Sequence, residues 1–121
     1  MIQNTKIYVS GHEGLVGSAL VRELQHRHYT NIVTVPFQNL DLRDQLSVNA
    51  FFKKEHPEWV ILAAARVGGI AENVRTPADF MIDNLLMAAN TIKAAFENGA
   101  KKLVFICSSS IYPSSVVAPK E

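Results

Sequence analysis

The stretch "YVSGHEGLVGSAL", residues 8–20, decides the fold of this 121-residue chain. It joins an apolar run to a helical pattern and places glycines at three-residue spacing, at Gly11, Gly14 and Gly17. Glycine suits positions where a chain turns sharply, where its backbone touches a pyrophosphate, and where a helix packs close to a sheet. The free N–H groups of the first helical turn then point at the phosphates. The motif predicts a dinucleotide-binding turn, and the alternative is a tight turn that needs glycine for its shape alone.

Strand and helix patterns alternate along the rest of the chain. Short apolar runs predict strands at 6–10, 31–35, 59–63 and 103–107, and helical periodicity predicts helices at 15–28, 44–56 and 78–98. The strand runs are continuous rather than alternating, which is typical of buried parallel strands. With right-handed crossovers, the pattern predicts an α/β fold: a truncated, Rossmann-type, doubly wound parallel sheet, most simply in strand order 3-2-1-4.

The composition favours one globular domain spanning residues 1–121. It is 48% hydrophobic and 19% charged, which argues against disorder, and its net charge of +1 provides no electrostatic footprint for nucleic acid or an anionic membrane surface. The apolar runs, such as "WVILAAA", are too short to span a bilayer. The single cysteine, Cys107, excludes an internal disulfide, so we expect a cytoplasmic protein.

Two further stretches are candidates for cofactor contacts. In "NLDLRD", residues 39–44, the carboxylate of Asp41 can accept from an adenine amino group and the backbone N–H of Leu42 can bond the ring. An ordinary acidic loop is the alternative. The third strand ends in small side chains, at Ala63, Ala64 and Ala65, which would let a flat cofactor lie close to the backbone. Close packing of the strand end is the alternative here.

One longer pattern resembles a known family. "ARVGGI", residues 65–70, is followed by Asn73, Pro77, Phe80 and Asn84 and later by "SSSIYP". Together with the glycine turn, it resembles the extended short-chain dehydrogenases/reductases, and among them the GDP-L-fucose synthases. The resemblance covers essentially all of this chain but only the amino-terminal part of the family's enzymes. It implies an NAD(P)-dependent 3,5-epimerase and 4-reductase of GDP-4-keto-6-deoxymannose.

The resemblance also implies roles for individual residues. Ser108 would hydrogen-bond the reacting 4-keto oxygen, Val67 and Gly68 would lie near the substrate, and Asp41 with Leu42 would hold the adenine. Ala63 to Ala65 would line the ribose and nicotinamide side. The pyrophosphate would lie on the turn formed by Gly11, His12, Glu13, Gly14, Leu15, Val16 and Gly17.

The chain departs from the family pattern in two places. The serine stretch usually reads G-S-S-C, with the cysteine as an acid/base group in epimerisation; here Ser110 stands at the cysteine position and Cys107 at the glycine position. A hydroxyl is far less acidic than a thiol, so Ser110 is a weak candidate for that role, and we expect Cys107 to be buried. Glu13 stands where a basic residue commonly meets the 2′-phosphate of NADP. The cofactor is therefore NADP or NAD, with Glu13 favouring NAD.

Superfamily catalysis also needs a tyrosine followed four residues later by a lysine, which lowers the phenol pKa. Tyr8, Tyr29 and Tyr112 have no such partner. We expect the pair, the remaining strands and the substrate domain to lie beyond Glu121, so that this chain alone is inactive. Two alternatives remain: a non-catalytic dinucleotide-binding or interaction module, and a relative that acts on another nucleotide sugar.

The helix predicted at 78–98 carries two apolar stripes. Since the family's dimers pair this helix, we expect a homodimer through it. The stripe assigned to the sheet is Ile82, Leu85, Ala89, Ile92 and Phe96. The stripe assigned to the dimer is Phe80, Met87 and Ala94.

Overall fold

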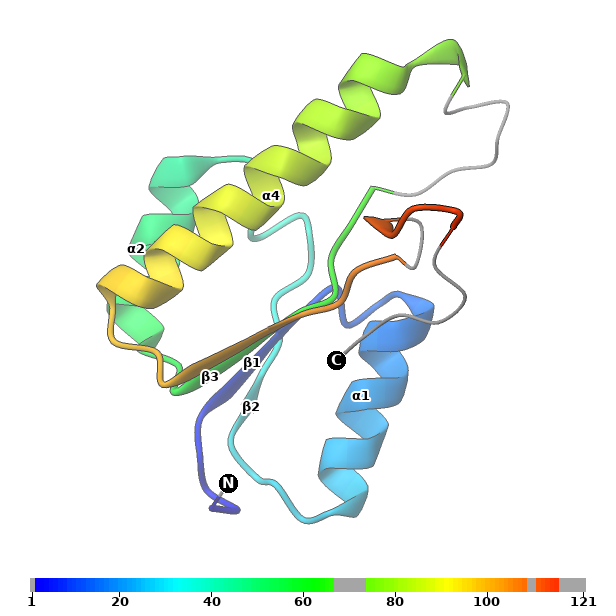
Figure 1. Ribbon diagram of the computed structural model, residues 1–121. Coiled ribbons are helices and arrows are strands. Elements are labelled where there is room, and N and C mark those ends of the chain that lie inside the picture. The colour runs from blue at the N-terminus through cyan, green and yellow to red at the C-terminus, as the bar shows by residue number, and fades with distance from the viewer. Residues whose placement is uncertain (1, 67–73, 109–110, 116–121) are drawn as a thin grey trace.

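Four parallel strands form a sheet with helices on both faces in the computed structural model, which describes residues 2–66, 74–108 and 111–115 (Figure 1). The α/β, Rossmann-type class predicted from the sequence is confirmed. The elements are β1 (Ile7–Ser10), α1 (Leu15–His26), β2 (Ile32–Val33), α2 (Gln45–Glu55), β3 (Trp59–Leu62), α4 (Pro77–Glu97) and β4 (Lys102–Phe105).

The predicted strand order 3-2-1-4 is wrong, because the sheet has the order β2-β1-β3-β4. β3 pairs with β1 over four residues, from Ile7 opposite Trp59 to Ser10 opposite Leu62. β2 pairs with β1 over only two residues, and Pro36 follows shortly after it. So short a strand offers little edge for a third strand, whereas β1 is buried along its whole length and gains from a partner on each side. The chain therefore crosses over β1 after its second strand rather than after its third.

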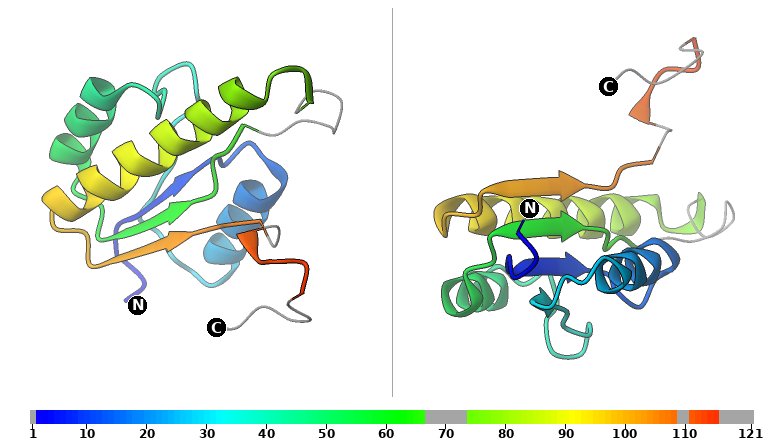
Figure 2. Two further views of the ribbon diagram at one scale, coloured as in Figure 1. Left: turned by 45° about the horizontal axis from the view of Figure 1, so that its top comes forward. Right: turned by 90° about the horizontal axis from the view of Figure 1, so that it is seen from below.

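Alternation along β1 divides the core between the two faces of the sheet. Tyr8 faces the helices α2 and α4, where it packs with Phe52 and Ala94. Ile7 and Val9 face α1 and belong to a second cluster. Successive strand residues point to opposite faces, so a continuous apolar strand is buried only if both faces are covered. α2 and α4 lie side by side on one face, and α1 covers the other (Figure 2).

Helix ends follow local signals in the sequence. Asp44 directly precedes α2 and caps it by accepting the backbone N–H of Leu46 at 3.2 Å. The first helix ends at His26, two residues earlier than predicted, because His28 adopts the left-handed conformation with φ 66°. Gly99, with φ 76°, supplies the same conformation after α4 at no steric cost.

The prediction of which stripe of α4 faces the sheet is wrong. Leu85 is 60% exposed and Phe96 is 85% exposed, so the stripe assigned to the sheet faces away from it. The buried side of the helix carries Phe80, Asn90, Thr91, Ala94 and Ala95. Most of these side chains are small, which lets α4 lie close to β3 and α2; large aliphatic side chains there would hold the helix away.

Candidate dinucleotide-binding site

The structure gives different reasons for glycine at the three positions of the turn. Gly11 has φ +71°, and a Cβ there would lie 2.7 Å from the backbone N of Ala64. A Cβ on Gly17 would lie 2.0 Å from the carbonyl oxygen of Gly11. The fold itself therefore requires both glycines, because a side chain at either one would collide with backbone.

Gly14 is not required in this way. A Cβ there would meet only the carbonyl oxygen of Gly11, at 3.4 Å, which is ordinary contact distance, and its φ of −79° suits any residue. Gly14 is the N-cap of α1, where a side chain that caps the helix is usual, yet it offers none. The missing side chain leaves the mouth of the cleft open beside the helix terminus, which fits a bound pyrophosphate.

The first turn of α1 presents N–H groups without intrahelical acceptors. The first bond within the helix runs from the Ser18 N–H to the carbonyl of Gly14, at 2.9 Å. The N–H groups of Leu15, Val16 and Gly17 precede it, and no acidic side chain lies in this turn. Glu13 lies just before it and is exposed, with Oε1 3.9 Å from His12 Nε2. The first turn itself therefore carries no carboxylate that would repel an anion at the helix terminus.

A cleft lies at the carboxyl ends of β1 and β3 and consists of two adjoining cavities, of about 380 Å³ and about 90 Å³. A small-molecule site commonly has a volume of this order. Both cavities are lined by Gly11, Phe37, Ala64 and Met87. Further lining residues of the larger one are Gly14, Arg43, Ala63, Ala65, Arg66 and Asp83. Further lining residues of the smaller one are Tyr8, His12, Glu13, Val35, Leu40 and Leu42.

The alanine wall of the cleft is held by Ser10, which the sequence analysis did not single out. Its buried hydroxyl accepts the backbone N–H groups of Ala63 at 3.2 Å and Ala64 at 3.3 Å, and donates to the carbonyl of Ile61 at 3.4 Å. The turn and the wall are thus joined by one side chain. A polar residue at the end of an otherwise apolar strand is the signal that could have identified it.

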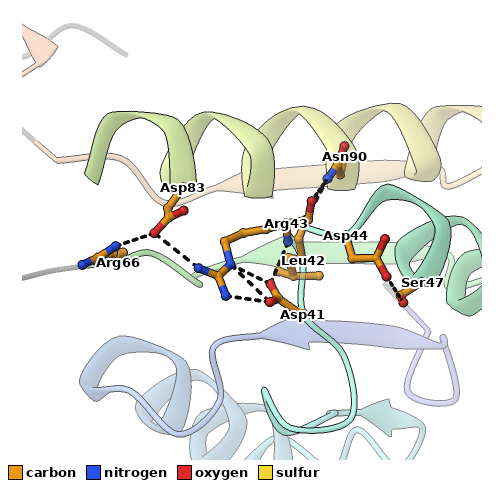
Figure 3. Close-up of polar contacts among 8 residues, drawn as sticks. All are labelled: Asp41, Leu42, Arg43, Asp44, Ser47, Arg66, Asp83 and Asn90. Carbon is orange, nitrogen blue, oxygen red and sulfur yellow. Dashed lines mark hydrogen bonds and ion pairs between the residues drawn. The ribbon is translucent and has the colours of Figure 1, made fainter. Parts of the chain in front are cut away.

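Asp41 is engaged by Arg43 (Figure 3). The guanidinium donates to the Asp41 carboxylate from Nε at 3.0 Å and from Nη2 at 2.7 Å, and the backbone N–H of Arg43 donates at 2.9 Å. These bonds hold the pKa of Asp41 below its usual value. The Leu42 carbonyl accepts from the Asn90 amide at 3.0 Å, and the Leu42 side chain is buried at the smaller cavity. The loop that is expected to meet adenine is thus anchored to α4.

Asp83, on α4, is shared by two arginines (Figure 3). Its Oδ2 lies 2.6 Å from Arg66 Nη1 and 3.4 Å from Arg43 Nη1, and hydrogen bonding to Arg66 is the main reason that the pKa of Asp83 is lowered. The neighbouring Asn84 accepts the Arg66 backbone N–H at 2.7 Å and donates to its carbonyl at 3.1 Å. The segment after β3 is therefore fixed to α4 just before residue 67.

Ser108 lies beyond β4 and is exposed. The Ile106 N–H donates to the Leu62 carbonyl at 3.0 Å, so the chain leading to Ser108 continues beside the chain leading to Ala63. Ser108 does not line either cavity. Cys107 is exposed, and the expectation that it is buried is wrong, because β4 ends at Phe105. Val67, Gly68 and Ser110 lie outside the described residues.

The described ranges contain no cluster of three or more His, Cys, Asp or Glu side chains suited to a metal ion. No helix in the part of the chain that the structure describes is long and apolar enough to cross a membrane.

The sequence and the fold match known proteins. The model of the NAD dependent epimerase/dehydratase family matches residues 7–121. GDP-L-fucose synthase 1 of Arabidopsis thaliana is 50% identical over 117 residues, which cover 97% of this chain and 36% of that protein. The chain thus spans about a third of the length of such relatives.

Solved structures agree with this match. MlghC, a GDP-mannoheptose C4 reductase from Campylobacter jejuni solved with NADP bound, is 45% identical with a TM-score of 0.92, over 100% of this chain and 38% of that one. An NADP-bound GDP-L-fucose synthetase from Naegleria fowleri is 29% identical with a TM-score of 0.84, over 98% and 38% of the two chains. With its glycine turn, parallel sheet and cleft, this chain belongs to the NAD dependent epimerase/dehydratase family.

Proposed function

We propose that this chain is the NADP-binding part of a nucleotide-sugar epimerase/reductase of the GDP-L-fucose synthase type. The observation that carries the proposal is Gly14, the one glycine of the turn that packing does not require, at the mouth of a cleft of suitable size. The identity to GDP-L-fucose synthases and the NADP bound in two similar structures support it. The expected compartment is the cytoplasm, since these 121 residues contain a single cysteine and therefore no disulfide of their own.

The chain's own residues would divide the work of binding. The N–H groups of Leu15 to Gly17 would bind the pyrophosphate, and the wall of Ala63 to Ala65 would let the nicotinamide side lie against the backbone. Asp41 and Leu42 would face the adenine. When bound, NADPH supplies a hydride to a carbonyl carbon of the sugar. Ser108 would donate a hydrogen bond to that carbonyl oxygen and hold it in position.

Gly14→Ala tests the binding site without disturbing the fold. The added methyl group makes only ordinary contact with the protein but enters the mouth of the cleft. We expect NADP affinity, measured by calorimetry, to fall about tenfold or more, with the urea midpoint almost unchanged. Leu15→Ala, at an exposed side chain of the same turn, is the matched control and should retain binding. Unchanged NADP affinity in Gly14→Ala would contradict the proposal.

We further propose that residues 1–121 hold the cofactor, and that the tyrosine–lysine pair and the substrate domain belong to a part of the protein outside this chain. The length of the relatives supports this, since the matched region is 36% of the Arabidopsis protein. The chain alone should bind NADPH without oxidising it in the presence of GDP-4-keto-6-deoxymannose. Turnover above the buffer rate, followed at the NADPH absorbance, would contradict this division.

A second candidate function is reduction at C4 of a GDP-sugar without epimerisation. Ser110 at the position of the family's acid/base cysteine favours it, and so does the 45% identity to a GDP-mannoheptose C4 reductase. The test is deuterium uptake at the sugar carbons in heavy water, catalysed by the whole protein. A C4 reductase leaves those positions unlabelled, and Ser110→Cys should raise the labelling if the serine limits it.

We also propose a homodimer through α4, by the stripe that faces away from the sheet. Ile82, Leu85, Ala89, Ile92 and Phe96 follow one another at alternating three- and four-residue spacing, which is typical of a helix-pairing seam. The four large side chains of this stripe are each at least 43% exposed. Burying each of them would contribute roughly 1.5 to 3 kcal/mol.

Sedimentation equilibrium at tens of micromolar tests the dimer. Leu85→Glu should yield a monomer, because a carboxylate would be buried in an apolar seam. Lys93→Glu changes an exposed charge of the same helix and should leave the dimer intact. A monomeric wild-type chain, or a Leu85→Glu variant that still dimerises, would overturn the proposal.

A further inference from the structure

The cleft is lined by an arginine, Arg43, that belongs to neither the glycine turn nor the end of β2. Arg43 comes from the connection between β2 and α2, yet it lines the larger cavity together with Gly11, Gly14 and Phe37. Its guanidinium carbon lies 5.5 Å from the centroid of the Phe37 ring. Phe37 follows β2, and the end of this strand is where Rossmann-type sites recognise the ribose of the adenosine.

The guanidinium is held in place from two sides (Figure 3). Asp41 binds Nε and Nη2, and Asp83 approaches Nη1 at 3.4 Å from α4. A guanidinium has five N–H donors, and these contacts use three of them. The other two have no acceptor in the described part of the chain. An arginine restrained in this way loses little entropy when it binds an anion.

We propose that Arg43 binds the 2′-phosphate of NADP and so sets the cofactor preference of this cleft. The inference rests on the proposed dinucleotide site and names the residue that distinguishes its two possible occupants. A phosphate accepts charge-assisted hydrogen bonds from a guanidinium, often two in parallel. Asp41 and Asp83 balance the charges of Arg43 and Arg66, but they bind three of the N–H groups of Arg43, so two N–H groups remain for the phosphate. In this arrangement Arg43 outweighs Glu13, the residue whose charge is expected to favour NAD.

Calorimetric titration with NADP and NAD separates the roles of the neighbouring charges. Wild-type chain should bind NADP more tightly than NAD. Arg43→Gln should weaken NADP binding about tenfold or more and change NAD binding by about twofold at most. Arg66→Gln is the matched control: it removes the other arginine that lines the cavity and contacts Asp83, and it should leave the NADP/NAD ratio unchanged. Arg43→Lys should recover part of the preference, because it retains the charge but not the fork.

The role of Arg43 is overturned, and the dinucleotide site is not, by any of three results: a wild-type preference for NAD, an unchanged NADP/NAD ratio in Arg43→Gln, or an equal shift of that ratio in Arg66→Gln. Failure of the folded wild-type chain to bind either cofactor contradicts the proposed function as well. If Arg43→Gln does not fold by circular dichroism, the Arg43→Lys ratio decides, and a ratio equal to that of the wild type overturns the inference.

Discussion

The hydroxyl oxygen of Ser10, the last residue of β1, accepts the backbone N–H of Ala64, just beyond the end of β3, at 3.3 Å. This bond links the ends of β1 and β3 at the place where the segments that follow these two strands separate and form the cleft. It also explains a polar side chain that is only 1% exposed in an apolar strand, since the Ser10 oxygen accepts partly buried N–H groups that lie beyond the end of β3.

Ser10→Ala should destabilise the fold by about 1 to 3 kcal/mol, because it leaves the N–H groups of Ala63 and Ala64 unsatisfied. Urea denaturation measures the change. Ser18→Ala, which removes an exposed hydroxyl bonded to the Leu15 carbonyl, should stay within about 0.5 kcal/mol of wild type. Equal effects of the two substitutions would contradict this role for Ser10.

Gly17→Ala should be severely destabilising, by more than about 3 kcal/mol, because its Cβ would lie 2.0 Å from the Gly11 carbonyl oxygen and backbone would have to move. The thermal or urea midpoint of unfolding is the measurement. Gly14→Ala, in the same turn, should cost less than about 1 kcal/mol, because its Cβ meets nothing closer than 3.4 Å. A Gly17→Ala variant as stable as Gly14→Ala would refute this explanation of the turn.

His28→Gly should stabilise the chain by up to about 1 kcal/mol, because the residue has φ 66° and is exposed, so that little packing is lost. Urea midpoints provide the comparison. His26→Gly, two residues earlier and still within α1, should destabilise by about 1 kcal/mol, since glycine is unfavourable inside a helix. The sign of the effect should thus reverse between the two histidines.

Thr91→Val should stabilise the fold by about 1 kcal/mol. The Thr91 hydroxyl is fully buried and has no hydrogen-bond partner among the residues that the structure describes, and valine has nearly the same shape without the polar atom. Thr91→Ser retains the hydroxyl and loses the methyl group, so it should destabilise. Denaturation by urea distinguishes the two, and a destabilised Thr91→Val would indicate that the hydroxyl is satisfied.

The stability of the chain should fall on the acid side in part because of Asp41. Arg43 lowers the pKa of Asp41 in the folded state, so the pair contributes stability above the unfolded pKa of about 4 and loses it as the pH falls through the folded pKa. Asp41→Asn should be less stable than wild type at pH 7. It should also lose less stability than wild type between pH 5 and pH 2, an interval that spans the ordinary aspartate pKa of about 4. Arg43→Gln should flatten the same part of the urea-midpoint profile. Parallel profiles for all three proteins would contradict the assignment.

Local features of the chain were readable from the sequence. The glycine turn, the cap at Asp44 and the alternation of strands and helices depend on neighbouring residues, and neighbouring residues are what a pattern records. That the turn needs glycines was predictable for the same reason. Why Gly11 in particular must lack a side chain was not predictable, because the atoms that exclude a Cβ there belong to Ala63 and Ala64, more than fifty residues away.

Only the tertiary structure decided which strands pair and which face of α4 is buried. Both stripes of α4 are apolar, and the 3.6-residue period favoured the one that contains Ile82 and Leu85. The structure buries Ala94 and Thr91 instead, since close approach to the sheet needs small residues. In the same way, Arg43 is held at the cleft by Asp41 and Phe37 of its own connection and by Asp83 of α4, forty residues further along the chain. The sequence by itself determined the helices, the strands and the glycine turn, because these depend on neighbouring residues. The strand order, the buried face of α4 and the place of Arg43 in the cleft depend on contacts between distant segments, which no single stretch of sequence contains.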